Sequence, residues 1–140
     1  MRYILTLLIL ISGGAFTGCN TKDPYNLVSV GLLKGYTLTE GRGSDFYSAE
    51  IKKKDGLFIE FYLGRLPGLA ATPAEKNKYK WFQEQSINGH PVYFALKEAE
   101  GETWLLVTFM KNGANFITKV SSPADVAEAM AMILTYKPTN

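Results

Sequence analysis

Four short turn sequences, each ending in glycine, divide most of this chain into segments of strand length. In chain order they are Asp55-Gly56, Asn88-Gly89, Glu100-Gly101 and Asn112-Gly113. Such pairs favour tight hairpins, because glycine takes a positive φ without a Cβ clash. The segments that they delimit are 46–53, 57–63, 81–87, 92–96, 103–109 and 115–120. The sequence therefore predicts β-hairpins, with the last four segments forming an antiparallel meander. A further strand or an irregular segment is expected within 27–39.

A helix is expected after the last strand. Ser122 can cap it, Pro123 suits its first position, Asp125 favours the positive end of the helix dipole, and Pro138 ends it. The helical period places one apolar stripe on Val126, Met130, Ile133 and Leu134. Because a single helix with one apolar stripe must cover something, the sheet is its expected partner.

The segment 72–75 reads Thr-Pro-Ala-Glu and has the form of a capping box, so one or two helical turns are expected before Lys80. The predicted fold class is α+β. We expect residues 27–140 to form a single domain, a meandering antiparallel sheet with the C-terminal helix packed on one face.

The first 18 residues have the layout of a secretory signal. A positive start at Arg2 precedes the apolar segment 3–11, which is far shorter than the roughly 20 residues of a membrane helix. Small residues follow in 12–15. The structural alternative, an ordinary buried helix or strand, is disfavoured by Gly13-Gly14 and by the position at the very start of the chain.

Phe16-Thr17-Gly18-Cys19 then resembles the lipobox of bacterial lipoproteins, although that pattern prefers Leu where Phe16 stands. The resemblance implies cleavage before Cys19, a diacylglyceryl group on its sulfur, and usually an acyl group on the new amine. Cys19 is the only cysteine in the chain, and lipidation explains an odd cysteine in an exported protein. The alternative is a plain secretory signal.

These assignments divide the chain into a signal peptide (1–18), a lipidated tether (19–26) and the domain (27–140). Asn20 follows the cysteine, and the absence of Asp there favours an outer membrane, facing the periplasm, in an organism with two membranes. Removal of Arg2 leaves 14 Lys and Arg against 13 Asp and Glu, a net charge of +1. A nucleic-acid partner needs a basic face, so none is expected.

No recognised catalytic or metal-binding spacing occurs in the chain. His90 is the only histidine and lies in a turn between Gly89 and Pro91. Segment 41–44, Gly-Arg-Gly-Ser, lacks the ending of a phosphate-binding loop. Serine nucleophile motifs are absent as well. We therefore expect no catalytic residue, no metal ligand and no cofactor, and we expect that the protein is not an enzyme.

Two features suggest a partner-binding surface. The apolar loop 64–71 follows a strand, and loops often carry binding residues. Lysines then alternate with aromatic residues in 76–82, a mixture that suits a membrane interface. The candidate binding residues are Arg65, Leu66, Lys78, Lys80 and Trp81. In the structural alternatives the loop is a packed connector, and Trp81 or Phe82 enters the core while the lysines stay in water.

From about Trp81 onward, the order of hairpin strands and a closing helix loosely resembles small extracytoplasmic domains of bacterial anti-sigma regulators. This resemblance assigns no functional residue. The function expected first is a lipid-anchored, non-catalytic envelope module that binds a protein, a peptidoglycan fragment or a lipid. The second is an inhibitor or immunity-type lipoprotein that caps a secreted toxin or hydrolase. The third is a hydrolase, which the missing nucleophile-and-base pair disfavours.

Overall fold

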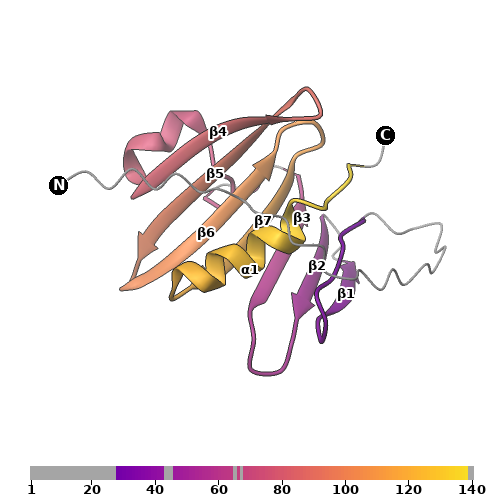
Figure 1. Ribbon diagram of the computed structural model, residues 1–140. Coiled ribbons are helices and arrows are strands. Elements are labelled where there is room, and N and C mark those ends of the chain that lie inside the picture. Colours follow the sequence, from indigo (N-terminus) through magenta and orange to yellow (C-terminus); the bar gives the residue numbers. More distant parts are fainter. Residues whose placement is uncertain (1–27, 43–45, 65, 67, 139–140) are drawn as a thin grey trace.

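The computed structural model describes residues 28–42, 46–64, 66 and 68–138. In this part of the chain seven strands form one antiparallel sheet, in the order β1-β2-β3-β7-β6-β5-β4 (Figure 1). The strands are β1 (Thr37–Arg42), β2 (Tyr47–Lys52), β3 (Phe58–Leu63), β4 (Trp81–Ile87), β5 (His90–Ala99), β6 (Glu102–Phe109) and β7 (Ala114–Val120). The helix α1 (Pro123–Ile133) crosses one face of the sheet (Figure 1). The antiparallel sheet with a C-terminal helix is confirmed, but one helix beside seven strands makes the fold mainly β.

The predicted hairpin turns form, and two of them have the expected backbone. Asn88 and Gly89 take φ values of 53° and 78°, and Glu100 and Gly101 take 54° and 79°. Positive φ at both central residues matches the right-handed twist of the flanking strands. At the β2–β3 turn, glycine at position 56 is favoured by lack of space and not by its φ, because the positive φ of 56° belongs to Asp55. A Cβ on Gly56 would instead lie 3.2 Å from the Tyr36 hydroxyl and 2.6 Å from Cε of Lys53.

The pairing of β3 with β7 joins the two halves of the sheet. The register places Phe61 opposite Phe116 and Ile59 opposite Thr118. This contact links segments more than 50 residues apart, and no local pattern indicated it. At the other end, β1 begins only at the close of the 27–39 segment and continues beyond it, and it pairs with β2 along its whole length.

The expected N-terminal end of α1 is confirmed. Ser122 Oγ accepts a hydrogen bond from the Asp125 N–H at 3.2 Å, and the Asp125 carboxylate accepts one from the Ser122 N–H at 3.0 Å. This reciprocal pair satisfies N–H groups that have no partner inside the helix. The expected stripe is wrong in part. Ala129, Met132 and Ile133 are the buried residues, while Val126, Met130 and Leu134 pack at the margin.

The main core lies between the sheet and α1. Its centre is a cluster of four aromatic rings, contributed by Phe61, Phe109, Phe116 and Tyr136. Phe116 is fully buried, and its ring centroid lies 4.9 Å from that of Phe61 and 5.3 Å from that of Tyr136. Burial also raises the pKa of the Tyr136 phenol, whereas a hydrogen bond from Asn112 acts in the opposite direction.

A smaller core lies on the opposite face of the sheet. Ala95, Leu106 and Ile117 are buried there beneath Leu69, Ala71 and Tyr79 from the β3–β4 connection. That connection contains the 3-10 helix η1 (Pro73–Lys78), which confirms the expected helical turn before Lys80. The predicted capping box is wrong, because the Thr72 side chain makes no capping hydrogen bond. The Glu75 carboxylate instead pairs with Lys78 at 2.9 Å.

Candidate functional site

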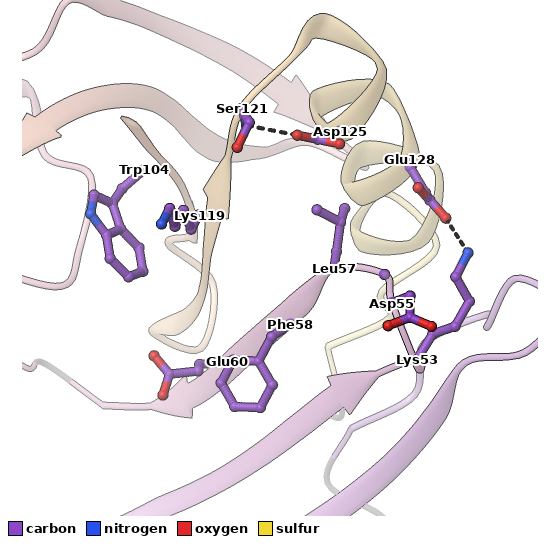
Figure 2. A pocket seen from close by; sticks show the side chains of 11 residues that line it. Lys53, Asp55, Leu57, Phe58, Glu60, Trp104, Lys119, Ser121, Asp125 and Glu128 are labelled. Atoms are coloured by element: carbon purple, nitrogen blue, oxygen red, sulfur yellow. Dashed lines mark hydrogen bonds and ion pairs between the residues drawn. The ribbon is translucent and has the colours of Figure 1, made fainter. Parts of the chain in front are cut away.

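A groove of about 570 Å³ lies between the β2–β3 turn and the first half of α1 (Figure 2). It continues onto the sheet face opposite the helix. This volume falls within the range of roughly 300–1,000 Å³ that is typical of small-molecule sites. Its lining residues are Lys53, Asp55, Gly56, Leu57, Phe58, Glu60, Trp104, Lys119, Ser121, Asp125 and Glu128.

One wall of the groove is held by a network around Glu128. Its carboxylate oxygen Oε1 accepts hydrogen bonds from Lys53 Nζ at 2.9 Å and from the Tyr36 hydroxyl at 3.0 Å (Figure 2 shows the lysine contact). The same hydroxyl accepts a bond from the Leu57 N–H at 3.1 Å, and Lys53 Nζ lies 4.7 Å from the Tyr36 ring centroid. These contacts connect the turn to α1, so the wall is fixed relative to the helix.

The same network shifts two pKa values. Burial is the main cause that raises the pKa of the Tyr36 phenol, and the hydrogen bond to Glu128 adds to it. The pKa of Lys53 rises chiefly because its ammonium group donates to the Glu128 carboxylate. Both groups therefore keep their protons at neutral pH. The wall presents a hydroxyl and an ammonium group around one carboxylate.

The second wall is the start of α1. The Asp125 carboxylate accepts hydrogen bonds from the Ser121 N–H at 2.7 Å and from the Ser122 N–H at 3.0 Å. Figure 2 shows Ser121 and Asp125 at the rim, on the far side of the groove from Lys53. Because backbone N–H groups already engage this carboxylate, its structural role is to hold the helix end.

The floor of the groove is an outward-facing row of side chains on three neighbouring strands. Trp104 on β6 is the direct partner of Lys119 on β7. Ile59 of β3 is paired with Thr118 of β7. The residue before Ile59, Phe58, therefore lies beside Lys119, the residue after Thr118. The row therefore reads aromatic, lysine, aromatic. Phe58 is 45% exposed, and Trp104 lies at the border between the groove and the smaller core.

Both lysines of the groove are paired with glutamates. Lys53 pairs with Glu128, and Lys119 pairs with Glu102 beside the row. Two further carboxylates, Asp55 at the turn and Glu60 on β3, line the opening. The pKa of the Tyr62 phenol is raised by burial and then by the charge of Glu60 and a hydrogen bond to it. The groove thus offers carboxylate acceptors, ammonium donors and two aromatic rings.

The predicted binding residues that the structure describes, Leu66, Lys78, Lys80 and Trp81, do not line this groove. Arg65 lies outside the described residues, and Leu66 is half-buried. Lys78 pairs with Glu75 across η1, and Lys80 pairs with Glu98. Trp81 is 42% exposed, whereas Phe82 packs against Tyr79 and Tyr93 in the smaller core. Leu69 and Ala71 of loop 64–71 act as a packed connector. The surface of Lys78, Lys80 and Trp81, where η1 ends and β4 begins, stays a prediction.

His90 begins β5 and is exposed. It lines a smaller cavity of about 270 Å³ near the C-terminal segment. Across the part of the chain that the structure describes, no group of three or more His, Cys, Asp or Glu side chains is placed to hold a metal ion. Cys19 and residues 1–18, the expected signal peptide, lie outside the described residues.

Four residues of the groove, Phe58, Glu60, Trp104 and Lys119, were not among the predicted site residues. A signal for two of them exists in the sequence. In 57–63 the positions between the buried residues should be polar, yet Phe58 occupies one of them. Trp104 occupies an outward position in a segment that is otherwise apolar, so periodicity alone hides it. An aromatic residue on the outward face of a strand does not identify the site by itself, because Phe82 and Tyr93 share that feature and pack in the smaller core.

No protein-family model, curated protein or solved structure matches this chain.

Among the described helices, none is long and apolar enough to cross a membrane.

Proposed function

We propose that this chain is a lipid-anchored protein of the bacterial envelope whose domain binds a partner in the groove. The observation that carries the binding role is the groove itself. A network of hydrogen bonds holds its wall, and Phe58 lies on its floor with 45% of its surface exposed. A depression of this size that combines aromatic rings with a few polar groups is typical of a recognition site.

The anchoring role depends on the sequence around Cys19. Two or three acyl chains hold a protein firmly at a bilayer, because each buried methylene contributes about 0.8 kcal/mol. Residues 20–26 reach only about 20–25 Å when extended, so the domain stays near the membrane surface. The absence of Asp after Cys19 favours the periplasmic face of an outer membrane. We expect no catalytic activity and no cofactor.

Palmitate labelling tests the anchor. The full-length chain should incorporate labelled palmitate, and Cys19→Ser should abolish both the label and cleavage after Gly18. A label that survives Cys19→Ser would contradict lipidation at this residue.

Photo-crosslinking in cells tests the groove. A photoreactive phenylalanine analogue replaces Phe58 in one variant and Met110 in a control variant, since these residues are 45% and 43% exposed. A defined adduct is expected at position 58 and not at position 110. Equal adducts at both positions, or none at position 58, would overturn the groove as the recognition site. A secreted toxin or hydrolase in the adduct would favour the inhibitor or immunity-type function.

A further inference from the structure

The row Phe58–Lys119–Trp104 narrows the chemistry of the ligand. Phe58 lies on β3 and Trp104 lies on β6. These strands flank β7, which carries Lys119. A ring face on a sheet surface can contact a flat, weakly polar ligand face over a large area. The groove walls add hydrogen-bonding groups around this floor. The ligand should therefore combine an apolar face with a polar edge.

Three simpler ligands fit poorly. An ammonium group between the two rings would have to displace the Lys119 side chain, which lies on the strand between them and pairs with Glu102. A small anion would meet four carboxylates, while both lysines already pair with glutamates. A bare acyl chain would cover six charged side chains in the lining and desolvate them without replacing their hydrogen bonds.

An extended peptide also fits less well than a ligand that uses side chains alone. Peptides that add to a sheet bind its edge, where backbone N–H and C=O groups are free. The floor of the groove belongs to β3, β7 and β6, which are inner strands paired on both sides. Backbone groups of the floor are therefore committed to the sheet, and recognition depends on rings, carboxylates and ammonium groups.

We propose that the groove binds a neutral glycan, a chain of β-1,4-linked N-acetylglucosamine. A pyranose ring has a C–H face that can stack on Phe58 and Trp104, and hydroxyl groups at its edge that can donate to carboxylates. Asp55 and Glu60 are the acceptors at the opening. Acidic sugars are disfavoured by the lining carboxylates. This assignment rests on the proposed function, which places the domain in the bacterial envelope.

The two tryptophans of the chain make a direct test possible. Trp104 lines the groove and Trp81 lies outside it. Trp81→Phe leaves Trp104 as the reporter, and Trp104→Phe leaves Trp81. Each full-length variant, in detergent micelles, is titrated with the N-acetylglucosamine tetramer. Emission from Trp104 should shift saturably to shorter wavelength, while emission from Trp81 should not move.

Two further variants, each in the Trp81→Phe background, test whether the emission shift of Trp104 depends on the aromatic ring of Phe58. Phe58→Ala should weaken binding about tenfold, because one of two stacking rings is lost. Met110→Ala, with matched exposure, should leave the affinity unchanged. Thermal melting of both variants verifies that the fold is retained. An acidic tetragalacturonate should bind at least about tenfold more weakly than the neutral tetramer, if carboxylate repulsion operates.

The glycan assignment is overturned by a Trp104 signal that does not saturate, by equal effects of Phe58→Ala and Met110→Ala, or by equal binding of the acidic oligosaccharide. A protein adduct at position 58 combined with no tetramer binding would retain the groove as the recognition site and remove the glycan. Loss of the palmitate label would instead remove only the anchor. The outcomes of the three experiments are therefore distinguishable.

Discussion

The two faces of the sheet are covered in different ways. On the helix face, α1 closes over a continuous core whose centre is the aromatic cluster around Phe116. On the opposite face, the β3–β4 connection covers only the part around Ala95, Leu106 and Ile117. The remainder of that face carries Phe58 and opens into the groove. One face therefore stabilises the fold, and part of the other is available to a ligand.

The contacts that hold the two covers also differ. Apolar packing attaches α1, together with the partly buried hydrogen bonds that Glu128 accepts from Tyr36 and Lys53. The connection on the opposite face is attached in addition by buried hydrogen bonds, since Thr108 Oγ1 accepts from the Ala71 N–H at 2.8 Å and donates to Asn115 Oδ1 at 2.9 Å. Asn115 Nδ2 in turn donates to the Gly64 carbonyl at 2.9 Å. These hydrogen bonds hold the β3–β4 connection in place on the sheet. They therefore set the boundary between the covered part of this face and the groove that Trp104 lines.

The two faces should differ most in the free energy of unfolding that is lost when one aromatic ring is removed from each. Phe116→Ala should lower the free energy of unfolding by about 3–5 kcal/mol, the usual cost for a buried phenylalanine. Phe58→Ala should lower it by less than about 1 kcal/mol, because the ring is half exposed. Urea unfolding of the two variants measures both values. Similar losses would mean that the groove floor is part of the structural core.

A smaller loss is expected from Thr108→Val, which keeps the side-chain shape. Removal of the hydroxyl leaves the Ala71 N–H without its acceptor and Asn115 without a donor, at a cost of about 1–3 kcal/mol. Thr103→Val, at a half-buried position of the same strand, is the matched control and should change stability by less than about 0.5 kcal/mol. An unaffected Thr108→Val variant would show that packing alone attaches the connection.

The smallest effect concerns the groove wall and depends on pH. Because the Glu128 carboxylate raises the pKa of Lys53, the pair stabilises the folded state below the ordinary lysine pKa of 10.5. This contribution is lost as the pH rises through the raised pKa. Glu128→Gln should therefore lower Tm slightly at neutral pH, and the difference should vanish in strong alkali. Glu100→Gln, at an exposed turn, should show no such pH dependence. A difference that persists in alkali would assign the effect to packing.

Local patterns predicted most of the elements and little of the site. Asn88-Gly89 and Ser122–Asp125 act within a few residues, so their turn and cap could be predicted from sequence. The β3–β7 pairing depends on contacts across half the chain, which periodicity does not encode. The groove depends on that pairing, because it brings Phe58 beside Lys119. The helix stripe was misplaced because Met132 faces the sheet while Leu134 lies at the helix end.

Amide hydrogen exchange of the full-length chain tests most directly whether the open part of the second face binds the ligand. The measurement compares the protein with and without the N-acetylglucosamine tetramer and requires no substitution. We predict slower exchange in segments 56–60, 102–104 and 119–125, which border the groove, and unchanged exchange in the β4–β5 hairpin 83–91. Protection confined to that hairpin, or to the surface of Lys78, Lys80 and Trp81, would contradict binding in the groove.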